Sequence, residues 1–96
     1  MATFIMLSTL GPEGAATVRE NPERIKAVND EVESMGVKVL QQYALLGPYD
    51  FCNILEAPDE DDVMALMLAI GAEGSLRTET VRGYSLDDLT RMLGKL

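Results

Sequence analysis

Two strand-like segments flank a Gly-Pro pair near the middle of the chain, and this arrangement constrains the fold more than any other feature. Residues 37–46 and 50–57 are rich in apolar side chains, and Gly47-Pro48 lies between them. Proline fixes one turn residue and glycine tolerates unusual dihedral angles, so the pair predicts a tight reversal between two strands. A strand and a helix precede this hairpin, and a helix and a strand follow it.

The segment before the hairpin predicts one strand followed by a loop. The strand covers residues 3–9, and both of its alternating sets of side chains are apolar. A strand that is apolar on both sides is usually covered on both sides. Residues 10–20 contain two glycines and a proline, so we expect a loop there with at most one short helical turn.

A helix is expected next, over residues 22–35. Asn21 suits the N-cap and Pro22 suits the first helical position. Gly36 suits the C-terminal cap. Apolar side chains recur within this segment at helical spacing, so one face packs inward. These side chains are Ile25, Val28, Val32 and Met35.

Strict alternation divides the hairpin side chains between the two faces of the sheet. In residues 37–46 it places Val39 and Tyr43 on one face and Leu40 on the other. Residues 50–57 also have apolar side chains on both faces. Pro58 marks the end of that strand, because proline cannot donate to a ladder of backbone hydrogen bonds.

An acidic run over residues 59–62 opens a second helix. Asp59 is a natural N-cap, and acids in the first turn favour the positive end of the helix dipole. A calcium loop is the alternative interpretation, but its alternating ligands and central glycine are absent. Residues 63–71 contain no charge, and their apolar side chains spread over roughly 200° of the helix, so this helix needs a second covering surface.

A fourth strand over residues 75–84 and a last helix complete the chain. Alternation along the strand places Arg77 and Glu79 on one face and Arg82 on the other. Ser85 is the expected N-cap of the last helix, which has an amphipathic stripe. The stripe consists of Leu86, Leu89, Met92 or Leu93, and Leu96.

This order of elements predicts an α+β fold of the ferredoxin-like βαββαβ type, as one domain over residues 1–96. Right-handed crossovers give an antiparallel sheet of order 4-1-3-2, with an extra C-terminal helix. Two helices cover one face, but one short helix cannot cover the other apolar face. A second copy is the simplest cover, which predicts a homodimer with its sheets paired in a dimeric α+β barrel, and the apolar second helix could extend this to a larger ring.

Composition excludes several functional classes. Sixteen acids and eight scattered bases give a net charge of −8, which argues against binding to nucleic acid or to an anionic membrane surface. The chain has no histidine, which argues against zinc, non-haem iron of the two-His type and Ser-His-Asp catalysis. We expect neither a metal site nor a cofactor. We place the protein in the cytoplasm, because it shows no membrane-spanning run or secretion leader and its single cysteine, Cys52, cannot form an internal disulfide.

Four short motifs resemble those of the GYD-domain family. They are Asn21-Pro22-Glu23-Arg24, the Gly47-x-Tyr49-Asp50 element within residues 43–50, Glu56-Ala57-Pro58-Asp59, and residues 77–82. The resemblance covers nearly the whole chain and implies a small protein of the dimeric α+β-barrel type. It implies no particular activity. Gly83-Tyr84 depart from the family's pattern of a small residue followed by phenylalanine.

Six residues are candidates for a ligand site: Tyr43, Tyr49, Asp50, Arg77, Glu79 and Arg82. Asp50 either accepts backbone N–H groups at the turn or lines the mouth of a pocket together with Tyr49. Tyr43 is either a core or interface residue or part of that site. Cys52, in a central strand, is expected to be an inert buried thiol.

The charges of the fourth strand need partners. Arg77, Glu79 and Arg82 either form ion pairs within the protein or hold an anionic ligand. Glu56 and Asn53 are candidate partners for Arg77 and Glu79, across the sheet or across the dimer interface.

Two classes of function remain open. The first is a non-catalytic homo-oligomer that binds a small molecule or a protein partner. The second is a cofactor-free enzyme that acts on a small organic substrate, including an anionic one, through acid–base chemistry of Tyr, Asp, Glu and Arg. A closed pocket with a raised-pKa carboxyl group beside Arg77 or Arg82 would favour the enzyme. A dry dimer interface would favour binding.

Overall fold

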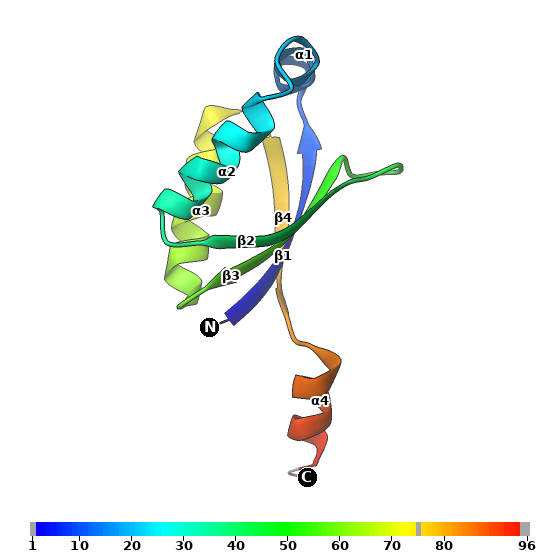
Figure 1. Ribbon diagram of the computed structural model, residues 1–96, viewed down its shortest axis with the longest axis vertical. Helices are drawn as coiled ribbons and strands as arrows, with labels where there is room; N and C mark the ends of the chain where they lie inside the picture. The colour runs from blue at the N-terminus through cyan, green and yellow to red at the C-terminus, as the bar shows by residue number, and fades with distance from the viewer. Residues whose placement is uncertain (1, 75, 95–96) are drawn as a thin grey trace.

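The computed structural model describes residues 2–74 and 76–94, which form a four-stranded antiparallel sheet and four helices (Figure 1). The spatial order of the strands is β2-β3-β1-β4, so the predicted ferredoxin-like fold and the predicted order 4-1-3-2 are confirmed. The strands are β1 (Ala2–Leu10), β2 (Lys38–Ala44), β3 (Phe51–Ala57) and β4 (Leu76–Gly83). The helices are α1 (Pro12–Glu20), α2 (Arg24–Ser34), α3 (Glu60–Glu73) and α4 (Leu86–Leu93).

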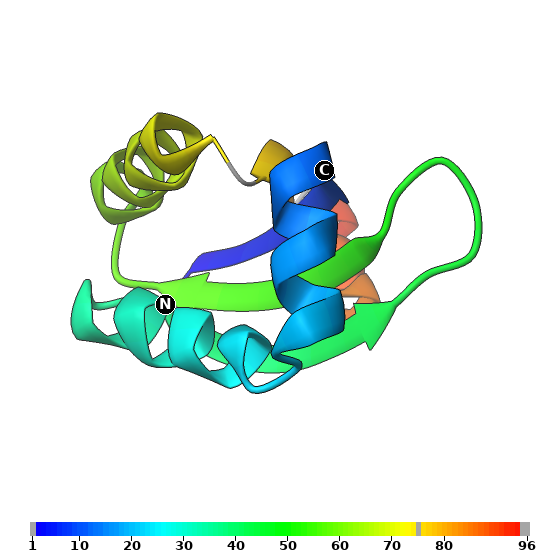
Figure 2. The same ribbon diagram turned by 90° about the horizontal axis from the view of Figure 1, so that it is seen from above.

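Helices α2 and α3 lie on the same face of the sheet, as Figures 1 and 2 show from two directions. The core fills the space between this face and the two helices. Alternate residues of β1 and β3 point into the core, and apolar residues of α2 and α3, spaced at helical intervals, pack against them. The buried core residues are Phe4, Met6, Val32, Val37, Leu55, Ala57, Val63, Leu66 and Ile70.

Residues 12–20 form helix α1, so the prediction of a loop in this segment was wrong. Pro12 occupies the first helical position, where a missing backbone N–H costs nothing. Asn21, predicted to cap the following helix, is instead the C-terminal cap of α1, and its N–H donates to the Thr17 carbonyl at 2.8 Å. The next helix therefore begins at Arg24, after a short turn.

A β-bulge in β2 changes which side chains share a face. Val39 pairs with Leu55 and Gln41 pairs with Ile54, which leaves Leu40 as the extra residue. A bulge shifts the alternation by one position, so Val39 faces the helices whereas Tyr43 faces the opposite side. The prediction that Val39 and Tyr43 share a face was wrong.

The connection at Gly47-Pro48 is a loop over residues 45–50 rather than a tight reversal. The loop is closed at its base by a hydrogen bond from the Leu45 N–H to the Asp50 carbonyl, at 2.8 Å. Gly47 has a φ of 132°, a conformation that residues with a side chain rarely adopt. Glycine therefore has a steric role in this loop.

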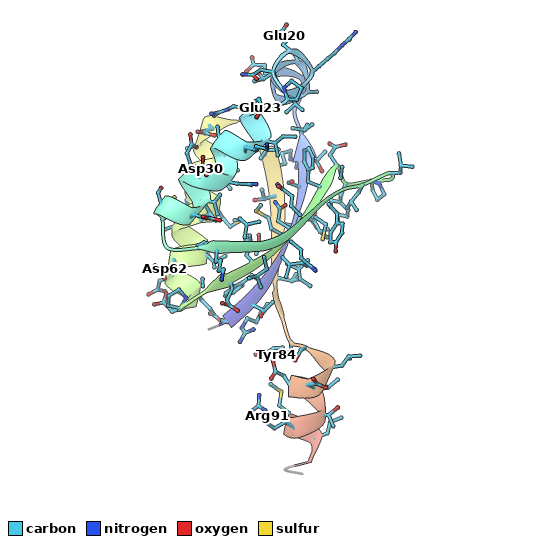
Figure 3. All side chains as sticks on the ribbon, viewed as in Figure 1. Glu20, Glu23, Asp30, Asp62, Tyr84 and Arg91 are labelled. Atoms are coloured by element: carbon cyan, nitrogen blue, oxygen red, sulfur yellow. The ribbon has the colours of Figure 1, made fainter. Side chains whose placement is uncertain are left out.

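The predicted caps of the last two helices are confirmed. The Asp59 carboxylate accepts hydrogen bonds from the N–H groups of Asp61 and Asp62, at 2.8 and 3.2 Å. The Ser85 hydroxyl accepts one from the Asp88 N–H at 3.0 Å. Helix α4 extends away from the sheet (Figure 1), and Figure 3 shows Tyr84 and Arg91 on this projecting part. Leu96, expected to belong to the apolar stripe of α4, lies outside the described residues.

Candidate functional site

The face of the sheet opposite α2 and α3, which we call the open sheet face, has an apolar centre. Ile5 pairs with Ile54 on one side and with Val81 on the other, so the three side chains form a row across the sheet. In the next row, Leu7 lies between Cys52 and Glu79. Val81 is 56% exposed. The strands are thus apolar on both faces, as expected. On the open sheet face, however, some of these apolar side chains are exposed to solvent.

A pocket of about 310 Å³ lies at the edge of the open sheet face, and we call it the rim pocket. Its lining residues come from β1, from β4 and from the loop over residues 45–50. They are Leu7, Thr9, Pro48, Tyr49, Arg77, Thr78 and Glu79. Three of the six candidate residues, Tyr49, Arg77 and Glu79, are therefore neighbours in this pocket.

Tyr49 ties the loop to β4. Its hydroxyl donates a hydrogen bond to the Glu79 carboxylate (Oε2) at 2.8 Å. This hydrogen bond, assisted by the negative charge of Glu79, raises the pKa of the Tyr49 phenol above its ordinary value of 10.0. The phenol therefore remains protonated at neutral pH and acts as a hydrogen-bond donor, not as a base.

Arg77 brings a positive charge to the rim pocket. It pairs with Thr9 in the β1–β4 register, and no ion pair joins it to another residue in the described part of the chain. Glu56 pairs with Thr3, at the other end of β1, and buried Asn53 belongs to the helix-facing set of β3. Neither suggested partner is therefore well placed to meet Arg77 within one chain. Pairing across a dimer interface stays a prediction.

Asp50 fastens the loop to the edge of β1. Its carboxylate (Oδ2) accepts a hydrogen bond from the Leu10 N–H at 2.7 Å, and its own N–H donates to the Ser8 carbonyl at 2.9 Å. A hydrogen bond to an ionised group is stronger than one between neutral groups. Asp50 positions the loop on which Tyr49 lies, but it is not among the residues that line the rim pocket.

Arg82 lies apart from the rim pocket, near the other end of β4. Its guanidinium (Nη1) donates to the Thr3 and Gly83 carbonyls at 3.1 and 2.6 Å and lies 4.4 Å from the centre of the Tyr84 ring. These contacts give Arg82 a structural role where the chain leaves the sheet.

Tyr43 and Cys52 are paired neighbours on the open sheet face, in β2 and β3. Tyr43 is 51% exposed, so it is not a core residue of the single chain. Cys52 is a free thiol that is only partly buried, which corrects the expectation of a buried one. The strand is central in the sheet, but its open face has no helix over it, and the thiol points to that face.

The structure buries two polar residues, Ser8 and Asn53, whose burial the sequence analysis did not predict. Both point toward the helices, and they are 1% and 6% exposed. The available signal was the appearance of a polar side chain in an otherwise apolar alternating set, after Phe4 and Met6 in β1. From the sequence, Asn53 was expected only as a partner for Arg77 or Glu79.

Two further observations bear on the kind of site. Among the residues described, no group of three or more His, Cys, Asp or Glu side chains is arranged to hold a metal ion. The described helices also include none with both the length and the apolar character needed to cross a membrane.

The fold and the rim pocket define a small α+β protein with an apolar sheet face and a polar pocket at its edge. The sequence pattern of the GYD domain matches residues 4–93, so the chain belongs to the GYD-domain family. The chain is 50% identical over 94 residues to a Thermus thermophilus protein named glutamine synthetase and cystathionine beta-lyase binding protein. That match covers 97% of this chain and 99% of the relative.

Solved structures share the fold at low sequence identity. MtbAldR superposes with a TM-score of 0.66 at 15% identity, over 88% of this chain and 52% of MtbAldR, so the chain spans about half the length of that protein. TTHA0845 from Thermus thermophilus superposes with a TM-score of 0.58 at 20% identity, over 88% of this chain and 95% of TTHA0845. At these identities the likeness is one of fold.

Proposed function

We propose that the protein is a non-catalytic binding protein that docks onto an enzyme of its own host, as a homo-oligomer in the cytoplasm. The observation that supports this most strongly is the 50% identity, over 97% of the chain, to a relative named for binding glutamine synthetase and cystathionine beta-lyase. These two enzymes are therefore the first candidate partners.

We assign the open sheet face to self-association. Its central row of Ile54, Ile5 and Val81 is apolar, and an apolar sheet face is energetically costly to leave in water. A second copy related by a two-fold axis presents the same side chains in return, so the two faces are complementary without any further protein. The rim pocket then lies at the edge of the interface, with Arg77 within reach of the other copy.

The outer surface of α3 is the apolar surface that we assign to the enzyme partner. Met64 and Leu68 are 63% and 68% exposed there, one helical turn apart. Since α3 covers the face opposite the open sheet face, this surface stays accessible when two open faces pair. Exposed Met and Leu side chains at helical spacing suit contact with another protein.

Calorimetric titration of purified glutamine synthetase and cystathionine beta-lyase from the same organism tests the proposal. We expect the wild-type protein to bind at least one of the two enzymes. Leu68→Glu should weaken that binding about tenfold or more, because it places a charge in an apolar contact. Ala27→Glu, which adds the same charge on exposed α2, is the matched control. Absence of binding to both enzymes would contradict the proposal.

The alternative of a cofactor-free enzyme depends on the rim pocket. Its best placed acid–base groups, Tyr49 and Glu79, are hydrogen-bonded to each other, and the pKa of the phenol is raised. A proton-transfer catalyst needs a group whose pKa lies near the working pH. The pocket is therefore better suited to holding an anionic group against Arg77 than to catalysis.

A further inference from the structure

A second cavity lies on the other side of the sheet, under helices α1 and α2. Its volume is about 80 Å³, and its wall contains apolar side chains from β1, β3, α2 and α3. Among these are Met6, Phe51, Leu55, Val28 and Ile70. One water molecule needs roughly 10–15 Å³ of cavity volume, so this cavity is several times larger than one water requires.

Two residues that line this cavity each have a buried side-chain oxygen without a hydrogen-bond partner in the described part of the chain. The two oxygens are the Ser8 hydroxyl (Oγ) and the Asn53 amide oxygen (Oδ1). Met6 pairs with Asn53 and Ser8 pairs with Phe51, so the two polar residues are diagonal neighbours on adjacent strands. A buried polar atom without a partner destabilises the fold, and most such atoms in proteins are paired.

Two further lining residues supply polar groups, one from α2 and one from β2 directly beside Asn53. Asn29 of α2 and Gln42 of β2 both line it, and the Asn29 amide donates to the Gln42 oxygen at 2.8 Å. Donors and acceptors are thus combined with an apolar wall. Of the charged residues at the cavity, Arg24 already lies 3.6 Å from Glu31 and Glu73 is exposed at the end of α3. A charged occupant would need a buried counter-charge, so the composition of the wall favours a neutral one.

We propose that this cavity binds a small neutral primary amide, with an apolar body against Met6 and Leu55 and its N–H groups donating to Asn53 and Ser8. Both oxygens are buried, so binding requires these two side chains to rotate toward the occupant. A primary amide has the donors that these oxygens need, and its carbonyl can accept from the side-chain amides of Asn29 and Gln42, which also line the cavity. The site is independent of the open sheet face and of the proposed enzyme partner.

Titration with isobutyramide, followed through the backbone amide signals of the isotope-labelled protein by NMR, tests the proposal. 3-Methyl-2-butanone is the matched probe, since it has the same shape but a methyl group in place of the NH₂. We expect saturable shifts centred on β1 and β3 near Ser8 and Asn53. We also expect the amide to bind about tenfold more tightly than the ketone, because only the amide satisfies the buried oxygens.

Asn53→Leu removes the acceptor while nearly preserving the shape of the side chain. It should weaken isobutyramide binding about tenfold and leave ketone binding unchanged. Ser8→Ala is the second variant should Asn53→Leu not fold, and Asp87→Asn, at an exposed position of α4, is the control. The proposal is overturned if neither probe gives saturable shifts, which would indicate a cavity filled by water alone. It is also overturned if both probes bind equally well or if the shifts map to the rim pocket.

Discussion

At the residue scale, the contacts of the loop over residues 45–50 decide how the Gly-Tyr-Asp element works. The Asp50 carboxylate accepts a hydrogen bond from the Leu10 N–H and thereby fixes the position of the loop against β1. Tyr49 reaches across to Glu79 on β4. The element therefore connects three separated stretches of chain, and Gly47 supplies the backbone conformation that allows it. The sequence located these residues, but the identity of their partners depends on long-range packing.

The Tyr49–Glu79 hydrogen bond predicts a specific titration. Because the pKa of Tyr49 is raised in the folded protein, the unfolded chain loses this proton first as the pH rises. The contribution of the pair to stability is therefore fully present below pH 10.0, the ordinary tyrosine value, and is lost as the pH rises through the folded-state pKa. We expect near-ultraviolet absorbance to show Tyr49 ionising above pH 10.0.

Two variants assign that ionisation. Tyr49→Phe should remove the ionisation that occurs above pH 10.0, which we call the late step. Glu79→Gln should move this ionisation to lower pH, because a neutral amide no longer disfavours the phenolate. Tyr43→Phe is the matched control and should leave the late step in place. A late step that persists in Tyr49→Phe would show that the hydrogen bond does not form in solution.

At the element scale, local signals predicted the start of α3 and α4 correctly but misplaced the start of α2. Asp59 and Ser85 cap α3 and α4 as predicted, because each accepts an N–H group only two or three residues away. Asn21 has the right residue type for an N-cap, but the helix before it extends far enough to use it as a C-cap. Local capping preferences cannot decide between two adjacent helix ends that compete for one residue.

The Asp59 cap predicts a measurable loss of stability. Asp59→Ala leaves the Asp61 and Asp62 N–H groups without this acceptor, and we expect the free energy of unfolding to fall by about 1 kcal/mol. Urea denaturation followed by circular dichroism measures the difference. Asp59→Asn retains an oxygen acceptor and should lie close to the wild type. Equal losses in both variants would mean that charge, and not the cap, is the important contribution.

At the scale of the whole molecule, the two faces of the sheet differ in how much of their apolar surface is buried. The helix-facing side is buried under α2 and α3, whereas the open sheet face and the apolar side of α4 remain exposed, with Leu86 79% and Leu89 45% exposed. The molecule measures 51 × 28 × 19 Å, and α4 lies at one end of its long axis (Figure 1). Such a shape leaves more apolar surface in water than a small protein normally keeps.

The assignment of the open sheet face to self-association predicts the effect of charge there. Val81→Glu and Ile5→Glu each place a carboxylate near its own copy across a two-fold axis, where it would lose water and meet a like charge. We expect both variants to be monomers by light scattering, with native circular dichroism for Val81→Glu because Val81 is already 56% exposed. Ala27→Glu should leave the oligomer unchanged. An unchanged oligomer in both open-face variants would refute this assignment.

The sequence by itself determined the order of the main elements, the caps at Asp59 and Ser85, the two-sided apolar strands and the strand order of the sheet. The elements, caps and apolar faces depend on periodicity and on contacts within a few residues, whereas the strand order follows from the order of the elements through the right-handedness of crossover connections. Only the tertiary structure decided that residues 12–20 are helical, that a bulge at Leu40 turns Tyr43 to the open sheet face, and that Tyr49 meets Glu79 in the rim pocket. The physical reason is that helix ends, strand register and buried cavities depend on which distant segments pack together, and no short window of sequence contains that information.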